Sequence, residues 1–178
     1  SIAQVNATTS VAPVQLVGAV TGASDINALG VNGNGTSAIA LDRTGTGAVN
    51  AGGIVNYTIV GNGLQATRTT LSAAQGAFLD RSGTALDGAI IAGAVDPING
   101  RFVVGKSAAG SVRLWEYTPT SLNNNSRFLY LGQVVTGTSA GENGDISFDA
   151  QGNLHIVQTA ADSSNVGMFS VTRESLLA

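Results

Sequence analysis

A phrase of strand, turn and strand returns three times along this 178-residue chain, and it constrains the fold more than any other feature. In each copy an apolar run ends at a polar residue, a short turn containing glycine follows, and a second apolar run begins. The copies occupy residues 26–41, 90–104 and 145–157. The polar residues that open the turns are Asn32, Asp96 and Asp149, which lie 64 and 53 residues apart. Because a repeat of this length holds one small structural unit, the sequence predicts a protein built from three similar units.

Apolar and polar residues alternate with a period near two, and no stretch keeps the spacing of an amphipathic helix. Two hairpin signals, at residues 33–35 and 61–63, read Gly-Asn-Gly, and both residue types tolerate the positive φ of tight turns. We therefore expect an all-β fold. The first unit, about residues 26–71, and the second, about residues 90–135, each offer four strands, whereas the third, about residues 145–171, offers three.

One further strand pattern precedes the first unit. Residues 14–24 read VQLVGAVTGAS and echo residues 129–139, LYLGQVVTGTS, which contain the outermost strand expected for the second unit. This echo predicts a strand over residues 14–20 that completes the last unit and covers its exposed edge. The side chains assigned to this assembly strand are Val14, Leu16, Val17 and Val20. The chain then divides into an N-terminal arm, residues 1–13, and one β-repeat domain, residues 14–178.

The turns of the second and third copies carry a family resemblance. The segments DPINGR at residues 96–101 and DAQGNL at residues 149–154 resemble the turn between the first and second strands of β-propeller blades in bacterial surface and exported proteins. The first copy departs from this pattern, since it has Asn32-Gly33-Asn34-Gly35 in place of an Asp-led turn. The resemblance covers about residues 14–171 and implies a fold of three four-stranded, propeller-like blades, with no activity attached.

Three blades do not close a ring, because propellers carry roughly four to eight. One solution is a homodimer that closes a ring of six units, in which each N-terminal strand completes the last unit of the other copy. A second is that these residues belong to a longer chain. A third is a different stacking of the same units, as a β-sandwich or an open barrel. All three remain open at this level.

Composition narrows the partners and the compartment. The net charge is −3 and the eight cationic residues are scattered singly, so the chain lacks the basic patch that nucleic-acid binding needs. No apolar run approaches the roughly 20 residues of a membrane-spanning helix, so membrane insertion is not expected. The absence of cysteine excludes disulfides and thiolate metal sites. Many small residues with only 11% charged residues are typical of secreted bacterial and viral surface proteins, so we expect an extracellular or cell-surface location.

Two groups of polar residues are candidates for chemistry. The only histidine, His155, lies on a predicted strand near Asp145 and Asp149, which leaves open a Ser-His-Asp arrangement or a pair of hydrolytic carboxylates. The alternation of residues around His155 favours an ordinary strand residue that faces opposite to its neighbours. Glu142, Asp145 and Asp149 offer the hard oxygen ligands that calcium prefers, although they lack the EF-hand spacing. The alternative for these carboxylates is the capping of turns, and calcium is the only cofactor that the sequence leaves open.

One pair of aromatic residues is a candidate for ligand binding. Trp115 and Tyr117 are two positions apart on a predicted strand, so their rings share a face. Such a face is either a stacking platform for a carbohydrate or the apolar seam between two units.

From these patterns we expect a non-enzymatic, exported structural or adhesive module that acts through self-assembly or surface presentation. Its expected partner is itself, as a homo-oligomer or as the rest of a longer chain. A carbohydrate-binding propeller is the first alternative, with a glycan as ligand. A hydrolase that uses a carboxylate pair is the second.

Overall fold

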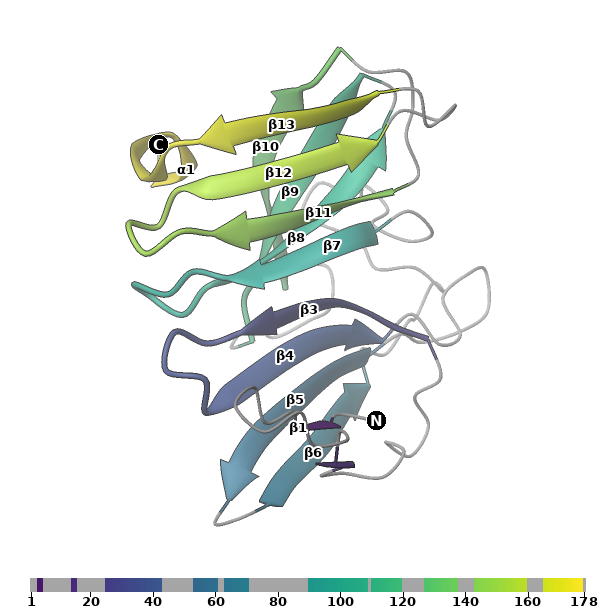
Figure 1. Cartoon of the computed structure of the whole chain (residues 1–178), viewed down its shortest axis with the longest axis vertical. Helices are drawn as coiled ribbons and strands as arrows, with labels where there is room; N and C mark the ends of the chain where they lie inside the picture. The colour runs from purple at the N-terminus through teal and green to yellow at the C-terminus, as the bar shows by residue number, and fades with distance from the viewer. Residues whose placement is uncertain are drawn as a thin grey trace.

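The computed structural model confirms the all-β class and arranges the chain in three antiparallel sheets of four, four and three strands. None of the sheets is closed on itself (Figure 1). The residues that the structure describes are 3–4, 14–15, 25–42, 53–60, 63–70, 90–108, 110–119, 127–137, 143–159 and 165–177. Within this part of the chain no helix has the length and apolar character that crossing a membrane requires.

Each sheet is a meander, in which strands adjacent in sequence are adjacent in space. The first sheet consists of β3 (Ile26–Val31), β4 (Ser37–Asp42), β5 (Gly53–Val60) and β6 (Gly63–Thr70). The second consists of β7 (Ile90–Val95), β8 (Phe102–Ala108), β9 (Ser111–Tyr117) and β10 (Phe128–Val135). The third consists of β11 (Asn143–Phe148), β12 (Leu154–Thr159) and β13 (Val166–Val171), and the short helix α1 (Arg173–Leu177) follows it.

The repeated turn joins the first and second strands of every sheet, which explains why its sequence recurs. In all three copies a glycine with positive φ donates its backbone N–H to the carbonyl of the opening polar residue, at 2.8 to 3.0 Å. These glycines are Gly35, Gly100 and Gly152, with φ of 70°, 75° and 81°. The side-chain oxygen of the opening residue also accepts a backbone N–H within its own turn. Turn capping is therefore what Asn32, Asp96 and Asp149 share.

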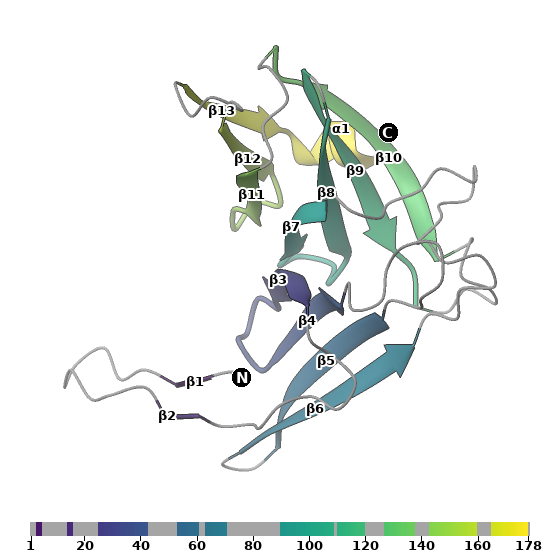
Figure 2. The ribbon, with the colours of Figure 1, turned by 90° about the vertical axis from the view of Figure 1, so that its right-hand side faces the viewer.

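The three sheets are stacked face to face, with the second between the other two (Figure 2). Their first strands β3, β7 and β11 lie closest together, while the later strands of the first two sheets diverge. One apolar core lies between the first and second sheets and contains Leu41, Ile54, Phe102, Trp115 and Phe128. Another lies between the second and third sheets and contains Val103, Leu114, Ile146, Leu154 and Ile156. Stacked units that bury a shared core are the arrangement expected of a repeat protein.

The N-terminal segment differs from the expectation. Val14 and Gln15 form β2 (Val14–Gln15), which pairs with β1 (Ala3–Gln4) as a separate two-stranded sheet. They do not pair with the third sheet, whose described strands number three. Pairing with a segment about ten residues away closes a short loop and so costs less chain entropy than pairing with β13. Leu16, Val17 and Val20 lie outside the described residues.

Candidate functional site

In the part of the chain that the structure describes, the third sheet has one strand fewer than the other two, and its last strand β13 is an edge. Alternation along β13 turns Phe169 and Val171 toward the core beside the second sheet. The opposite face carries Val166 and Met168, whose exposures of 63% and 77% are among the largest of the described apolar residues. An edge strand with exposed apolar side chains is a template for pairing with another strand. We call the free side of β13, with Val166 and Met168, the open edge.

A hydrogen-bonded row of polar side chains crosses the same outer face. His155 on β12 pairs in register with Ser170 on β13, and its Nδ1 lies 2.9 Å from the Ser170 hydroxyl oxygen. Its Nε2 lies 3.3 Å from Oδ2 of Asp149. In the neutral ring Nε2 carries the proton and donates to the carboxylate, so Nδ1 accepts from the Ser170 hydroxyl. Ser170 was not identified from the sequence, because only the strand register reveals that it lies opposite His155.

Asp149 is also held by its own turn. Its Oδ1 accepts the backbone N–H groups of Gln151 and Asn153, each at 2.9 Å, and its Oδ2 accepts the Asn153 side-chain amide at 2.9 Å. These hydrogen bonds, led by that of the Asn153 side chain and joined by His155, lower the pKa of Asp149 from 3.8 to about 2. Asp149 is thus an ionised turn cap that additionally orients the histidine.

Of the other carboxylates predicted for this region, the structure describes Asp145, which does not join the row. Asp145 is exposed on β11, and its Oδ1 accepts the backbone N–H of Ile146 at 2.8 Å. Glu142 lies outside the described residues. Within the described part of the chain, no three His, Asp or Glu side chains gather as a metal site would require. The arrangement orders one face of a sheet, and its members line neither of the two hollows described below.

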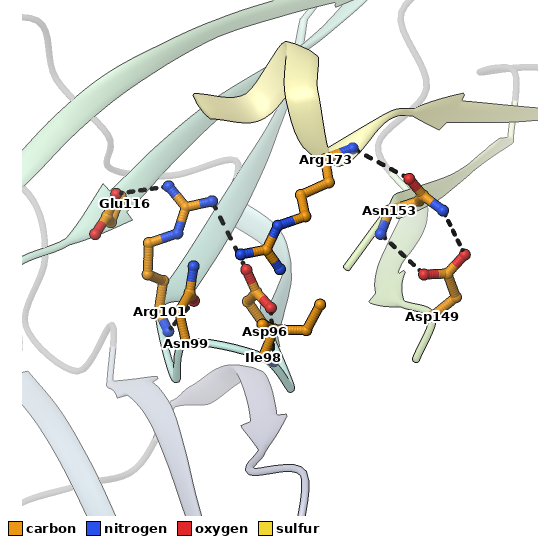
Figure 3. A network of polar contacts seen from close by, with 8 residues as sticks. All are labelled: Asp96, Ile98, Asn99, Arg101, Glu116, Asp149, Asn153 and Arg173. Carbon is orange, nitrogen blue, oxygen red and sulfur yellow. Dashed lines mark hydrogen bonds and ion pairs between the residues drawn. The ribbon is translucent and has the colours of Figure 1, made fainter. Parts of the chain in front are cut away.

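Two further groups of polar contacts hold the turns of the second and third sheets, and the group at the third sheet reaches the C-terminal segment (Figure 3). The Asp96 side chain is fully buried, and Arg101 places its guanidinium 3.8 Å from Asp96 and 3.2 Å from Glu116. Asn153 accepts the backbone N–H of Arg173 at 3.1 Å while its amide donates to Asp149. Asn153 therefore links the capped turn to the beginning of α1. These contacts fix loops and close no cavity.

The aromatic pair is located at the seam between sheets. Trp115 is 1% exposed and lies in the core between the first and second sheets, with its ring centroid 5.5 Å from that of Tyr130. Its ring is thus unavailable as a stacking platform for a sugar. Tyr117 is 6% exposed and packs in the same core, with its ring 5.5 Å from that of Phe128. Tyr117 also reaches the wall of a hollow between these sheets.

Two adjoining hollows lie between the first and second sheets, near their turns. The first has a volume of about 380 Å³ and the second about 370 Å³. Both are lined by Ile39, Asn56 and Gly100, so they form a continuous depression, which we call the intersheet groove. The second hollow adds Thr69, Phe102, Tyr117, Pro119 and Arg127. Sequence analysis did not identify this groove, because its wall is assembled from residues of two units.

Neither protein-family models nor curated sequences indicate a function for this chain, so the function is argued from the geometry described above. The chain matches no protein-family model, and no curated protein is significantly similar to it in sequence.

Proposed function

We propose that the protein is a non-enzymatic structural module that assembles with copies of itself and is presented outside the cell. The observation that carries this proposal is the open edge: among the described residues, the third sheet has three strands where its two neighbours have four. A strand added there gains main-chain hydrogen bonds and covers the exposed Val166 and Met168. Strand addition is thus favoured by both the polar edge and the apolar face.

The occupant proposed for the open edge is the segment of residues 14–20 from a second copy. Its sequence echoes β10, which is the outermost strand of the second sheet. A segment with the pattern of a fourth strand suits the sheet that lacks one. Residues Val14 and Gln15 pair with β1 within the chain, so assembly exchanges this short hairpin for a longer pairing in the neighbour.

The stacking of the sheets supports the same proposal. A stack buries its internal faces and leaves its two ends to be covered, so repeat proteins need caps or further units there. At one end, β3 exposes Leu29 and Val31 by 50% and 54%. The neighbouring strands β4 and β5 bury Ala40 and Val55 on the same face, so this end is covered in part. At the other end, the third sheet exposes Val166 and Met168. Whether copies close a six-unit propeller or extend as a filament depends on the rotation between them. We propose the closed, propeller-like ring.

The test is the solution mass of the full chain by light scattering over a range of concentrations. We expect a dimer that Met168→Lys and Leu16→Lys each convert to a monomer, because a lysine at either position places a charge in the new pairing. Val135→Lys is the matched control, since Val135 is 73% exposed on the edge strand of the second sheet. A chain that is monomeric at every concentration, or a dimer that Val135→Lys disrupts as much as Met168→Lys, would contradict the proposal.

A further inference from the structure

We propose that the intersheet groove is a binding site for a small acidic sugar, with Arg127 receiving its carboxylate. This inference is independent of self-assembly, because the groove lies between the first and second sheets and the open edge belongs to the third. Its volume of about 370 Å³ for the second hollow alone falls in the range of small-ligand sites.

The position of Arg127 is fixed by the end of the preceding strand. Its carbonyl oxygen accepts the backbone N–H of Thr118 at 2.7 Å and the Thr118 hydroxyl at 3.0 Å. Its guanidinium donates through Nη1 to the hydroxyl of Tyr117 at 3.4 Å. The side chain is half-buried, so its charge is held in place with reduced exposure to water. A cation positioned in this way is suited to a charged hydrogen bond with an anion.

The charge of Arg127 has no carboxylate beside it among the described residues. Arg68 pairs with Asp42 at 2.5 Å, and Arg101 lies near two carboxylates. Among the described residues, the Arg127 side chain by contrast donates to the Tyr117 hydroxyl, and its Nε is buried without a hydrogen-bond partner. Because the buried Nε has no surface toward the groove, a ligand carboxylate is received by the terminal nitrogens Nη1 and Nη2 of the guanidinium.

The remaining wall of the groove selects the rest of the ligand. Asn56 and Thr69 are exposed polar side chains that can exchange hydrogen bonds with hydroxyl groups. Ile39, which is half-buried, and Pro119, which is exposed, supply an apolar surface that suits the C–H face of a sugar ring. No other charged side chain lines the described groove. One cation, several neutral donors and an apolar floor together match a uronic acid better than a neutral sugar or a polyanion.

Isothermal titration calorimetry of the full chain tests this site with galacturonate, galactose and acetate. Galacturonate and galactose differ only in the carboxylate at C6, and acetate offers a carboxylate without a sugar. We expect galacturonate to bind with a dissociation constant near or below about 1 mM, and the other two to bind at least about tenfold more weakly. If galactose binds as tightly as galacturonate, the carboxylate has no role in binding. If acetate binds as tightly as galacturonate, the sugar ring has no role in binding. If galacturonate does not bind, the groove is not a site for an acidic sugar.

Variants locate the binding. Arg127→Gln is expected to weaken galacturonate binding by about tenfold or more, because it removes the only cation of the described wall. Arg113→Gln is the matched control, since Arg113 is an exposed arginine on β9 that does not line the groove. If Arg127→Gln unfolds the protein, Thr69→Val tests the same groove at an exposed position. We expect it to weaken galacturonate binding as well. Equal loss in Arg113→Gln, or unchanged binding in both groove variants, would contradict the proposal.

Discussion

The two faces of the second sheet pack against their neighbours with different kinds of side chain. Toward the first sheet the contact is aromatic and includes Trp115, Tyr117 and Phe128. Toward the third sheet the buried side chains are aliphatic and include Val112 and Leu114 of β9, the strand that also carries Trp115. Neighbouring residues of β9 thus serve two different cores, because successive side chains of a strand point to opposite faces. A sheet that is buried on both sides has to carry two apolar patterns in one sequence.

The first strands show the difference most clearly. β3 and β7 approach backbone to backbone: a Cβ on Gly93 would lie 2.4 Å from the carbonyl oxygen of Ala28, and one on Gly30 would lie 2.8 Å from the backbone nitrogen of Val95. A bulge in β3 produces this approach, with Ala28 at φ 56° and its N–H bound to the Asn27 side chain. The second and third sheets are separated by side chains instead. A Cβ on Gly105 of β8 would lie 3.6 Å from the side chain of Ile146 on β11.

The largest effect is therefore expected from Gly93→Ala. The new methyl group would overlap the backbone of β3, which cannot move aside as a flexible side chain can. We expect the free energy of unfolding to fall by about 3 kcal/mol, measured by urea denaturation.

Gly105→Ala is its counterpart on the other face of the sheet. A Cβ there meets Val112 at 3.5 Å and Ile146 at 3.6 Å, which is ordinary van der Waals contact. We expect a change within about 1 kcal/mol, since alanine also restricts the unfolded chain. Equal losses in the two variants would show that the two interfaces do not differ in this respect.

An effect smaller than that of Gly93→Ala is expected from a polar contact between the buried faces of the second and third sheets. Gln158 is fully buried and donates from Nε2 to the Ser107 hydroxyl at 2.8 Å. Ser107→Ala should lower the free energy of unfolding by about 1–3 kcal/mol, because the amide loses a partner in a site without water access. The double variant Ser107→Ala with Gln158→Met should recover part of this loss. If the double variant loses as much free energy of unfolding as the two single variants together, the two side chains do not interact directly.

The sequence predicted the strands well because its repeated phrase is a local signal. The turns at Asn32, Asp96 and Asp149 set their own hydrogen bonds, and the alternating runs around them form the three meanders. The packing of one sheet on the next was not predictable, because it depends on contacts such as Gly93 with Ala28, which are 65 residues apart. Periodicity gave no sign of the five-residue helix α1, which is too short to show a stripe.

The features of the candidate site also divide into local ones, which the sequence indicated, and ones that depend on distant strands, which it did not. The capping role of Asp149 was among the alternatives that the sequence offered, because it follows from a local turn. The pairing of His155 with Ser170 and the groove around Arg127 were not visible, since both require the register or stacking of separated strands. The open edge was visible as a missing fourth strand, because counting strands needs no knowledge of how the sheets pack.

The smallest effect concerns the turn that holds the third sheet to α1. It is measured as a change in the pKa of Asp149 and in the pH dependence of stability. Asn153→Ala removes the largest cause of the low pKa of Asp149, so that pKa should rise from about 2 toward 3.8. A carboxylate with a lowered pKa stabilises the fold fully above its unfolded value, and that stability is lost as the pH falls toward about 2. The variant should therefore lose less stability than the parent protein between these two pH values.

Carbon-13 NMR titration of the Asp149 carboxyl measures the pKa, and urea denaturation at several pH values measures the stability. Gln151→Ala is the control, because Gln151 donates to Asp149 through its backbone, which the substitution keeps. Its titration should match that of the parent protein. Since Asn153 also accepts the N–H of Arg173, Asn153→Ala should loosen α1 and increase hydrogen exchange there, whereas Gln151→Ala should not. An unchanged Asp149 pKa in Asn153→Ala would mean that the backbone donors of the turn and His155 hold the carboxylate without the Asn153 side chain. Unchanged hydrogen exchange in α1 would mean that the helix does not depend on the contact between Asn153 and Arg173.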